Sequence, residues 1–223
     1  MATPWDTRHN DLSAEQRIRT GLGFKAGERA YAALSNLAPG YGFWTVDTYT
    51  GERRWAISSE HLFQASKTTN PDERQRIFDA PTPWQAKETG RHVRLRMTRK
   101  AWDSGESIAA LHAANDAKFR QNPAALELLL STGGDHVYLY ENSGDRRWGV
   151  DSSGHGDNRM GLVLMRLRRE LRDERELAEA AKAITDDEAR IARRKRAANQ
   201  QRAAQAKRIA REIARAKNLS QGI

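Results

Sequence analysis

The chain contains no cysteine among its 223 residues, so disulfide bonds and thiolate metal sites are excluded. It also lacks any apolar run near the roughly 20 residues that a membrane-spanning helix requires. The polar N-terminal stretch MATPWDTRHNDLSAEQ contains no apolar signal-peptide core. From these absences we expect a cytoplasmic protein without a membrane-spanning segment.

Aromatic residues are absent after Trp148, and acids are scarce after Glu188. The net charge of the whole chain is +9. Residues 189–223 alone carry eleven Lys and Arg against one acid, Glu212, which gives this segment a charge of +10 and leaves −1 for the rest. The basic character therefore belongs to the C-terminal segment and not to the body.

We interpret residues 173–223 as a basic helical extension that is rich in alanine. A break is expected near residue 185, because the Thr-Asp-Asp-Glu run at 185–188 has the form of a capping box. A basic helix favours salt-dependent, sequence-independent binding to nucleic-acid phosphates. A solvated helix or a partner-binding coil would carry the same charge run. The candidate nucleic-acid contacts are Arg193, Arg194, Lys195 and Arg196.

The body carries repeated helix-start signals and a small amount of β pattern. Asn-Pro or Thr-Pro pairs, which suit an N-cap and a first helical position, occur at 70–71, 82–83 and 122–123. Residues 41–57 place aromatic and β-branched residues around a Thr-Gly turn and predict a β-hairpin. A short strand at 136–141, a long loop and a helix from Arg159 should follow. These patterns predict a mainly α fold, that is, α+β with a small hairpin and strand component.

The stretch SSEHLFQASK, residues 58–67, predicts a helix that begins after Ser58 or Ser59. Glu60, Gln64 and Lys67 then share one face at i, i+4 and i+7. An acid, an amide and an amine in a row fit either a solvated surface or the wall of an active site. Lys67 could hold a phosphate or, if burial lowered its pKa, act as an amine nucleophile; an ordinary solvated lysine is the alternative.

The loop YENSGDRRWGVDSSGHGDNRMG, residues 140–161, is the densest in chemically useful side chains. Trp148 beside Gly149 places a flat ring next to bare backbone and can stack a nucleobase, or it closes the core beneath the loop. A loop carboxylate near Glu60 would supply the paired acids that glycosidic cleavage commonly uses. The same acids could instead cap turns or pair with neighbouring arginines. The loop carboxylates are Glu141, Asp145 and Asp151.

Several familiar cofactor and catalytic signatures are missing. His61 and His155 have no partners at metal-ligand spacing. The chain has no P-loop, no Gly-x-Gly-x-x-Gly fingerprint and no Gly-x-Ser-x-Gly elbow. The sequence therefore predicts neither a metal site nor a cofactor.

Seven segments stand in order along the chain: LSNL at 34–37, SEHLFQASK at 59–67, AKETGR at 86–91, Trp102, KFRQN at 118–122, DRRWG at 145–149 and NRMG at 158–161 with Leu164-Met165. Taken together, they resemble the NADAR family of YbiA-like N-glycosidases. The resemblance covers a domain expected at 24–172, after an N-terminal segment, 1–23, that we expect to be partly flexible. Two departures concern the shape of the base pocket: Leu34 and Leu37 stand where the family often has Phe, and the spacing from Glu141 to Asp145 is about one residue short.

The resemblance implies an enzyme that cleaves a bond between ribose C1 and a nitrogen. Two substrate classes follow from it: ADP-ribose attached to guanine in nucleic acid, and a phosphoribosylamino-pyrimidine intermediate of riboflavin synthesis. The basic extension favours ADP-ribosylated nucleic acid, because a small riboflavin precursor needs no such arm. A non-catalytic module that binds ADP-ribose or a nucleotide is a second class of function, and a structural helical partner is a third.

The resemblance also implies roles for individual residues. Glu60 and Asp145 are the candidate acid–base residues, and Lys67 either holds the sugar or forms a transient imine with an opened ribose. Trp148, together with Trp102, would stack the base or the ribose face, and Arg91 would pair with a phosphate. The remaining candidates for substrate binding are Asn36, Phe63, Gln64, Gly149 and Asn158.

Overall fold

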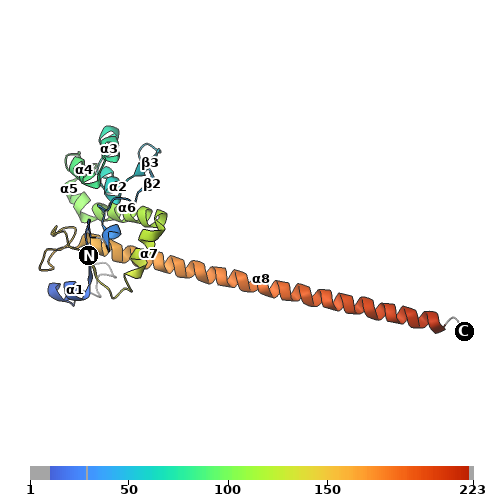
Figure 1. Ribbon diagram of the computed structural model, residues 1–223. Helices are drawn as coiled ribbons and strands as arrows, with labels where there is room; N and C mark the ends of the chain where they lie inside the picture. The colour runs from blue at the N-terminus through green and yellow to red at the C-terminus, as the bar shows by residue number, and fades with distance from the viewer. Residues whose placement is uncertain (1–10, 29, 221–223) are drawn as a thin grey trace. The chain divides into compact units, whose positions relative to one another are not determined.

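The computed structural model describes residues 11–28 and 30–220, and the chain divides into two compact units, 1–172 and 173–223. The first unit is mainly helical with two short two-stranded sheets, so the predicted fold class is confirmed (Figure 1). Its elements are α1 (Ala14–Thr20), β1 (Leu22–Phe24), η2 (Ala32–Leu34), β2 (Phe43–Val46), β3 (Arg53–Ala56), α2 (Ser59–Ala65), α3 (Pro71–Phe78), α4 (Pro83–Thr89), α5 (Arg99–Ala101), the π-helix η3 (Trp102–Glu106), α6 (Ser107–Gln121), α7 (Pro123–Ser131), β4 (Leu139–Glu141) and the start of α8 (Arg159–Ser220).

Three helices begin where the Asn-Pro and Thr-Pro pairs predict them. The side chain of Asn70 accepts from the N–H groups of Asp72 and Glu73, and Thr82 accepts from that of Gln85. Asn122 precedes α7 but does not cap it, because its side chain donates to the carbonyls of two other residues. Local capping chemistry therefore sets the start of α3 and α4, whereas tertiary contacts occupy the Asn122 amide.

The predicted hairpin is present as the antiparallel pair β2–β3, in which Trp44 lies opposite Trp55. The second sheet pairs β1 with β4 in parallel, from Leu22 opposite Leu139 to Phe24 opposite Glu141. The expected strand at 136–141 is confirmed only over its last three residues, and its partner strand β1 was not predicted. This pairing places Glu141 at the end of a buried strand, where the long loop begins.

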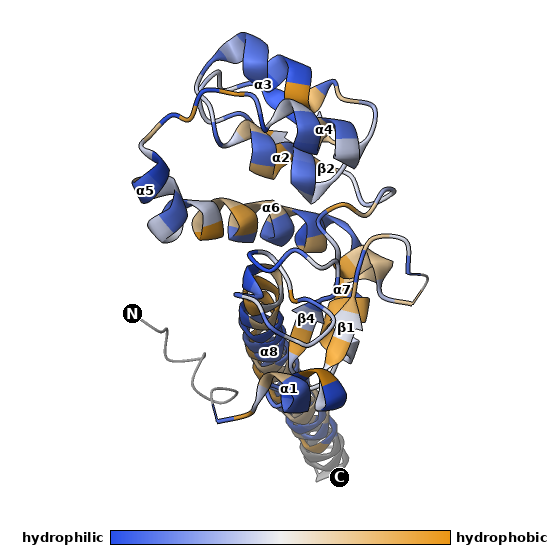
Figure 2. Cartoon of the chain, turned by 90° about the vertical axis from the view of Figure 1, so that its left-hand side faces the viewer, coloured by the Kyte–Doolittle hydropathy of each residue, from blue (hydrophilic) through white to orange (hydrophobic). Residues whose placement is uncertain are grey.

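Two apolar clusters hold the first unit together, and α2 contributes to both. Phe63 packs in the larger cluster with Phe24, Trp102 and the first turns of α8. Ala65 packs in the smaller cluster with Phe43 of β2 and Ile77 of α3. Figure 2 shows the apolar colouring concentrated on β1, β4 and α7, whereas α3 and α4 are largely hydrophilic. Burial on two sides fixes α2, the helix that carries Glu60.

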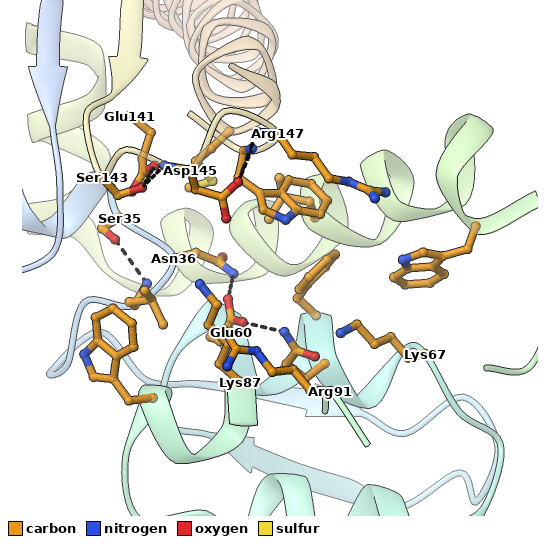
Figure 3. A pocket seen from close by; sticks show the side chains of 18 of the residues that line it. Ser35, Asn36, Glu60, Lys67, Lys87, Arg91, Glu141, Ser143, Asp145 and Arg147 are labelled. Atoms are coloured by element: carbon orange, nitrogen blue, oxygen red, sulfur yellow. Dashed lines mark hydrogen bonds between the residues drawn. The ribbon is translucent and has the colours of Figure 1, made fainter. Parts of the chain in front are cut away.

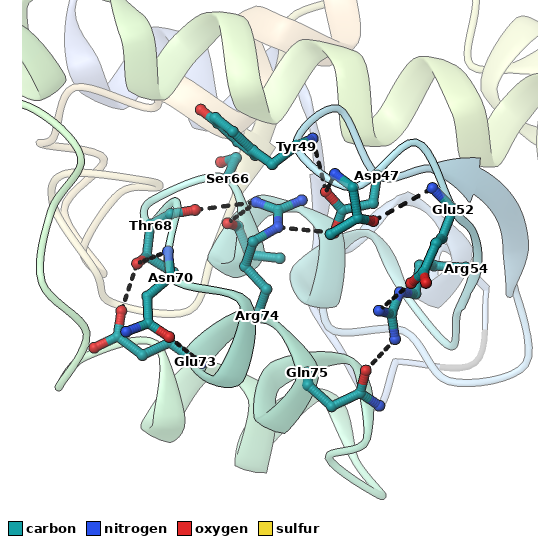
Figure 4. Close-up of polar contacts among 12 residues, drawn as sticks. Asp47, Tyr49, Glu52, Arg54, Ser66, Thr68, Asn70, Glu73, Arg74 and Gln75 are labelled. Atoms are coloured by element: carbon teal, nitrogen blue, oxygen red, sulfur yellow. Dashed lines mark hydrogen bonds and ion pairs between the residues drawn. The ribbon is translucent and has the colours of Figure 1, made fainter.

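A buried ion pair fixes the chain just after α2 (Figure 4). Arg74 Nε of α3 lies 2.8 Å from Asp47 Oδ2, and the two side chains are 4% and 1% exposed. Arg74 also donates to the carbonyl oxygens of Ala65 and Thr68, which lie on either side of Lys67 in the chain. The arginine therefore ties α3 and the loop after β2 to the segment that presents Lys67.

Helix α8 continues without interruption to Ser220, so the predicted break near residue 185 is wrong. Thr185 Oγ1 donates to the carbonyl of Ala181, four residues earlier, instead of capping a new helix. The surrounding alanine, arginine and lysine residues are strong helix formers, and extending a helix is easier than starting one. Residues 173–211 of α8 are nearly all exposed. Within the described part of the chain, no helix has the length and apolarity to span a membrane.

Candidate active site

A cavity of about 420 Å³ lies in the first unit, between α2 and the loop that follows β4 (Figure 3). Its lining comes from five places in the chain: the 35–37 turn, α2 and α4 with the residues just after them, the α5–α6 region, residues 141–148, and Met160 at the start of α8. Glu60 and Trp148, which stand far apart in the sequence, both line it. The cavity falls in the size range of pockets that hold drug-sized ligands, about 300–1,000 Å³.

Glu60 lies in the first turn of α2 and is 5% exposed. Its two carboxylate oxygens accept different hydrogen bonds: Oε2 from Asn36 Nδ2 and Oε1 from Gln64 Nε2, each at 2.5 Å. Side-chain amides therefore hold both oxygens of this carboxylate in place. The structure therefore brings Glu60, Gln64 and Asn36 together as one polar group, as the helical spacing predicts for the first two.

Helix α6 sets the orientation of Asn36. Asn115 Nδ2 donates to Asn36 Oδ1 at 3.1 Å, which leaves the Asn36 nitrogen to face Glu60. One turn later, Lys118 Nζ donates to the carbonyls of Ala33 and Ser35 at 3.0 and 3.3 Å, and burial lowers the pKa of Lys118 to about 7. Nothing in the sequence pattern of α6 singles out Asn115, because its partner lies 79 residues away.

Lys67 lines the same cavity and is partly buried. Its Nζ donates to the carbonyl of Gly90 at 3.1 Å. Burial, together with the positive charges of Arg99, Lys87 and Arg91, lowers the pKa of Lys67 to about 8, and the charge of Glu60 opposes this shift. A larger fraction of this amine is therefore neutral near neutral pH than for an ordinary lysine.

The aromatic residues form a continuous group beside Glu60. The ring centroid of Phe63 lies 5.2 Å from that of Trp148, edge to face, and 5.8 Å from that of Trp102. Trp102 is 2% exposed and belongs mostly to the core, whereas Trp148 is only partly buried. The guanidinium carbons of Arg147 and Arg159 lie 5.4 and 6.0 Å from the Trp148 ring. Of these two tryptophans, Trp148 has more surface to offer a ligand; a third, Trp84 of α4, also lines the cavity and is exposed.

Two loop carboxylates line the cavity. Asp145 Oδ1 accepts from the backbone N–H groups of Arg147 and Trp148 at 3.0 and 3.2 Å, so this acid also holds its turn. Glu141 accepts from Ser143 Oγ, and burial raises its pKa. The third loop acid, Asp151, does not line the cavity and accepts from backbone N–H groups of its own turn.

Cations line the side of the cavity formed by α4 and α5. Lys87 and Arg91 stand four residues apart on or just after α4, and Arg99 begins α5. Arg91 is exposed and bonded to Glu88 at 2.7 Å, whereas neither Lys87 nor Arg99 has a carboxylate partner among the described residues. Of these three cations, only Arg91 was predicted from the sequence, although Lys87 stands in the same AKETGR run, four residues before it.

Gly149 and Asn158 were predicted to bind substrate, but they do not line the cavity. A Cβ on Gly149 would fall 2.1 Å from the carbonyl oxygen of Glu141, so only glycine fits there. Asn158 has a φ of 47°; its Oδ1 accepts from the N–H of Glu141 and its Nδ2 donates to the carbonyl of Leu139. Both residues shape the loop behind the cavity and hold Glu141 in place.

The candidate nucleic-acid contacts lie elsewhere. Arg193, Arg194, Lys195 and Arg196 are exposed residues of α8 in the second unit. Among the described residues, no group of three or more His, Cys, Asp or Glu side chains is arranged to hold a metal ion.

Comparison with known proteins shows which family and which relatives this chain is similar to. Residues 24–172 match the profile of the NADAR domain. N-glycosidase YbiA of Escherichia coli (strain K12) is 35% identical over 152 residues, which cover 68% of this chain and 89% of that protein. An NMR structure of E. coli YbiA matches with a TM-score of 0.56 at 29% identity, covering 74% of this chain and 95% of that chain. The chloroplastic riboflavin biosynthesis protein PYRR of Zea mays is 31% identical over 150 residues, which cover 63% of this chain and 23% of that protein.

The fold, the cavity and these relatives define a hydrolase of the N-glycosidase class. The chain belongs to the NADAR family, as the motifs predict.

Proposed function

We propose that the chain hydrolyses the bond between ribose C1 and a nitrogen of guanine, and so removes ADP-ribose from modified nucleic acid. The observation that carries the proposal is the cavity itself. It combines the buried carboxylate of Glu60, the partly exposed ring of Trp148 and several cations in one space of about 420 Å³.

Glu60 is suited to the reacting carbon. Cleavage of a glycosidic bond leaves positive charge on C1 and its ring oxygen in an oxocarbenium-like transition state. A carboxylate fixed by Asn36 and Gln64 stabilises that charge without having to reorganise, and it accepts a proton from the attacking water. Asp145 adds a second negative charge on the opposite loop.

Lys67 and Trp148 position the substrate. The ring of Trp148 stacks against the base or the ribose face. Lys67, with its pKa lowered to about 8, holds a sugar hydroxyl or forms a transient imine with an opened ribose. Both roles need the amine inside the cavity, and both use the same end of the side chain.

The cationic side of the cavity supports ADP-ribose over a group with a single phosphate. Lys87 and Arg99 have no carboxylate partner within the described residues, and Arg91 and Lys67 line the cavity beside them. Lys87, Arg91 and Arg99 offer separate donors to the two linked phosphates of a pyrophosphate, and the planar fork of arginine matches phosphate oxygens.

A second candidate reaction has a specific observation in its favour. A relative from Zea mays is named a riboflavin biosynthesis protein, so cleavage of a phosphoribosylamino-pyrimidine is the alternative. A ribose 5-phosphate would place C1 at Glu60 and its single phosphate among the same cations.

Two incubations separate these functions. The protein is incubated with an oligonucleotide carrying ADP-ribosylated guanine and, separately, with the phosphoribosylamino-pyrimidine, and the products are separated by chromatography. We expect free ADP-ribose and restored guanine from the first. Release of ribose 5-phosphate from the second alone would show that the riboflavin intermediate is the substrate. Binding of ADP-ribose without release from either would indicate a non-catalytic module.

The basic half of α8 is proposed to hold the nucleic-acid strand. Replacing Arg193, Arg194, Lys195 and Arg196 with glutamine should weaken binding to a duplex and flatten its salt dependence. The slope of log K against log salt is about −0.9 per neutralised phosphate, so a loss of up to about 3.6 in the slope is expected. Fluorescence anisotropy at several salt concentrations measures it.

The matched control changes acids on the same helix. Asp186, Asp187 and Glu188 precede the basic run and are exposed. Their conversion to amides should leave binding equal or stronger. Unchanged affinity and slope in the arginine and lysine variant would contradict a nucleic-acid role for α8.

A further inference from the structure

Glu141 is a carboxylate that the structure fixes unusually well at the edge of the cavity. It is the last residue of β4, where it pairs with Phe24 of β1. Its N–H donates to Asn158 Oδ1 at 3.1 Å, and its carbonyl accepts from Val150 at 2.8 Å. Its side chain is 8% exposed and lines the cavity. A group placed this rigidly meets the geometric demand on a residue that transfers a proton.

The hydrogen-bond partners of the three cavity acids differ in kind. Glu60 accepts from two side-chain amides, and Asp145 accepts from two backbone N–H groups. The side chain of Glu141 accepts from the backbone N–H of Ser143 and from the Ser143 hydroxyl. A hydroxyl can either donate or accept, so this partner fits both the protonated and the ionised form of Glu141.

Burial and a neighbouring charge raise the pKa of Glu141. Burial raises the pKa of its carboxyl, and the negative charge of Asp145 on the same loop raises it further. The hydrogen bonds from Ser143 and the positive charge of Lys87 on α4 oppose this shift, and the pKa stays above its ordinary value. A carboxyl whose pKa is raised keeps its proton to a higher pH, which suits a general acid.

We propose that Glu141 is the general acid of the reaction, and this assignment rests on the N-glycosidase function proposed above. Its proton passes to the departing nitrogen as the bond from ribose C1 to that nitrogen breaks, and the electron pair of the bond goes to the nitrogen. The oxygen of water then bonds to C1, and Glu60 takes the proton of that water. Solvent returns a proton to Glu141 and removes one from Glu60, which closes the cycle.

The test uses two substrates that differ in their need for an acid. One is the ADP-ribosylated guanine oligonucleotide, and the other is a ribosyl substrate whose leaving group is 4-nitrophenolate, which departs without a proton. Glu141→Gln keeps the volume of the side chain and its bond to Ser143. It should reduce kcat by about 10²–10⁴-fold on the guanine substrate, the range for general acid catalysis. It should leave kcat on the nitrophenyl substrate near that of the wild type.

The pH profile of the wild type gives a second measurement that does not depend on the variant folding. The acid must be protonated, so kcat on the guanine substrate should fall as the pH rises through the pKa of Glu141. The nitrophenyl substrate should lack this alkaline fall. An equal loss on both substrates in Glu141→Gln, or equal pH profiles in the wild type, would overturn the assignment and indicate a structural role.

Glu60→Gln separates this inference from the function on which it rests. That variant should lose turnover on both substrates, because stabilisation of C1 is needed whatever the leaving group. If the wild type cleaves neither substrate, the proposed function fails. If the wild type cleaves both and Glu141→Gln keeps full activity on both, only the role of Glu141 fails.

Discussion

Glu60→Gln should lower kcat on ADP-ribosylated guanine by about 10²–10⁴-fold, the typical contribution of an acid–base group. The amide has nearly the same volume as the carboxylate, so the cavity keeps its shape. The variant side chain lacks the negative charge that stabilises C1 and the carboxylate oxygen that takes the proton of water. Steady-state kinetics on the oligonucleotide substrate measures the loss.

Binding should survive in the same variant. The cations and Trp148 remain in place, so the dissociation constant for ADP-ribose, measured by calorimetry, should change little in comparison with kcat. Glu52→Gln serves as the control, because Glu52 is an exposed acid near the hairpin that does not line the cavity. Full turnover in Glu60→Gln would remove Glu60 from the mechanism, and a lost affinity would make it a binding residue instead.

Local signals in the sequence predicted the parts of the site that lie on one helix. Glu60 and Gln64 are four residues apart, and helical spacing alone brings them together, as the 2.5 Å hydrogen bond between them shows. The starts of α3 and α4 were predictable for the same reason, because a cap and a proline act over three or four residues. These features need no knowledge of the rest of the fold.

Contacts between residues far apart in the sequence determine the features of the site that could not be predicted. Asn115 reaches Asn36 only after α6 packs beneath the 33–36 turn. Strands β1 and β4 are three residues each and lie more than a hundred residues apart, so neither has a pattern long enough to pair by inspection. Neither Gly149 nor Asn158 lines the cavity. A Cβ on Gly149 would clash with Glu141, and the side chain of Asn158 holds the backbone of Glu141. Their positions in the family motifs marked both residues but did not show that their roles are structural.

The predicted break in α8 was wrong because a local signal in the sequence was outweighed by its surroundings. A Thr-Asp-Asp-Glu run suits a helix start, yet the same residues are accepted inside a helix when strong helix formers flank them. The capping signal is local, and helix propagation through alanine-rich sequence outweighs it.

Arg74→Met should destabilise the first unit by about 3–5 kcal/mol, the usual effect of removing one partner from a buried ion pair. Asp47 would remain 1% exposed with its charge uncompensated, and the carbonyls of Ala65 and Thr68 would lose their donor. Urea unfolding monitored by tryptophan fluorescence gives the free energy of unfolding. Arg76→Met on the exposed side of α3 is the matched control and should change it by no more than about 0.5 kcal/mol.

The pH dependence of this loss is a sharper form of the same prediction. Burial raises the pKa of Asp47, but the hydrogen bond from Arg74 and those from the N–H groups of Tyr49 and Thr50 hold the pKa below its ordinary 3.8. A lowered folded pKa stabilises the protein above the ordinary value, and this stabilisation is lost as the pH falls through the folded pKa. The difference between wild type and Arg74→Met should therefore be largest near neutral pH and shrink in acid. A difference that stays constant with pH would show that Arg74 acts through packing and not through Asp47.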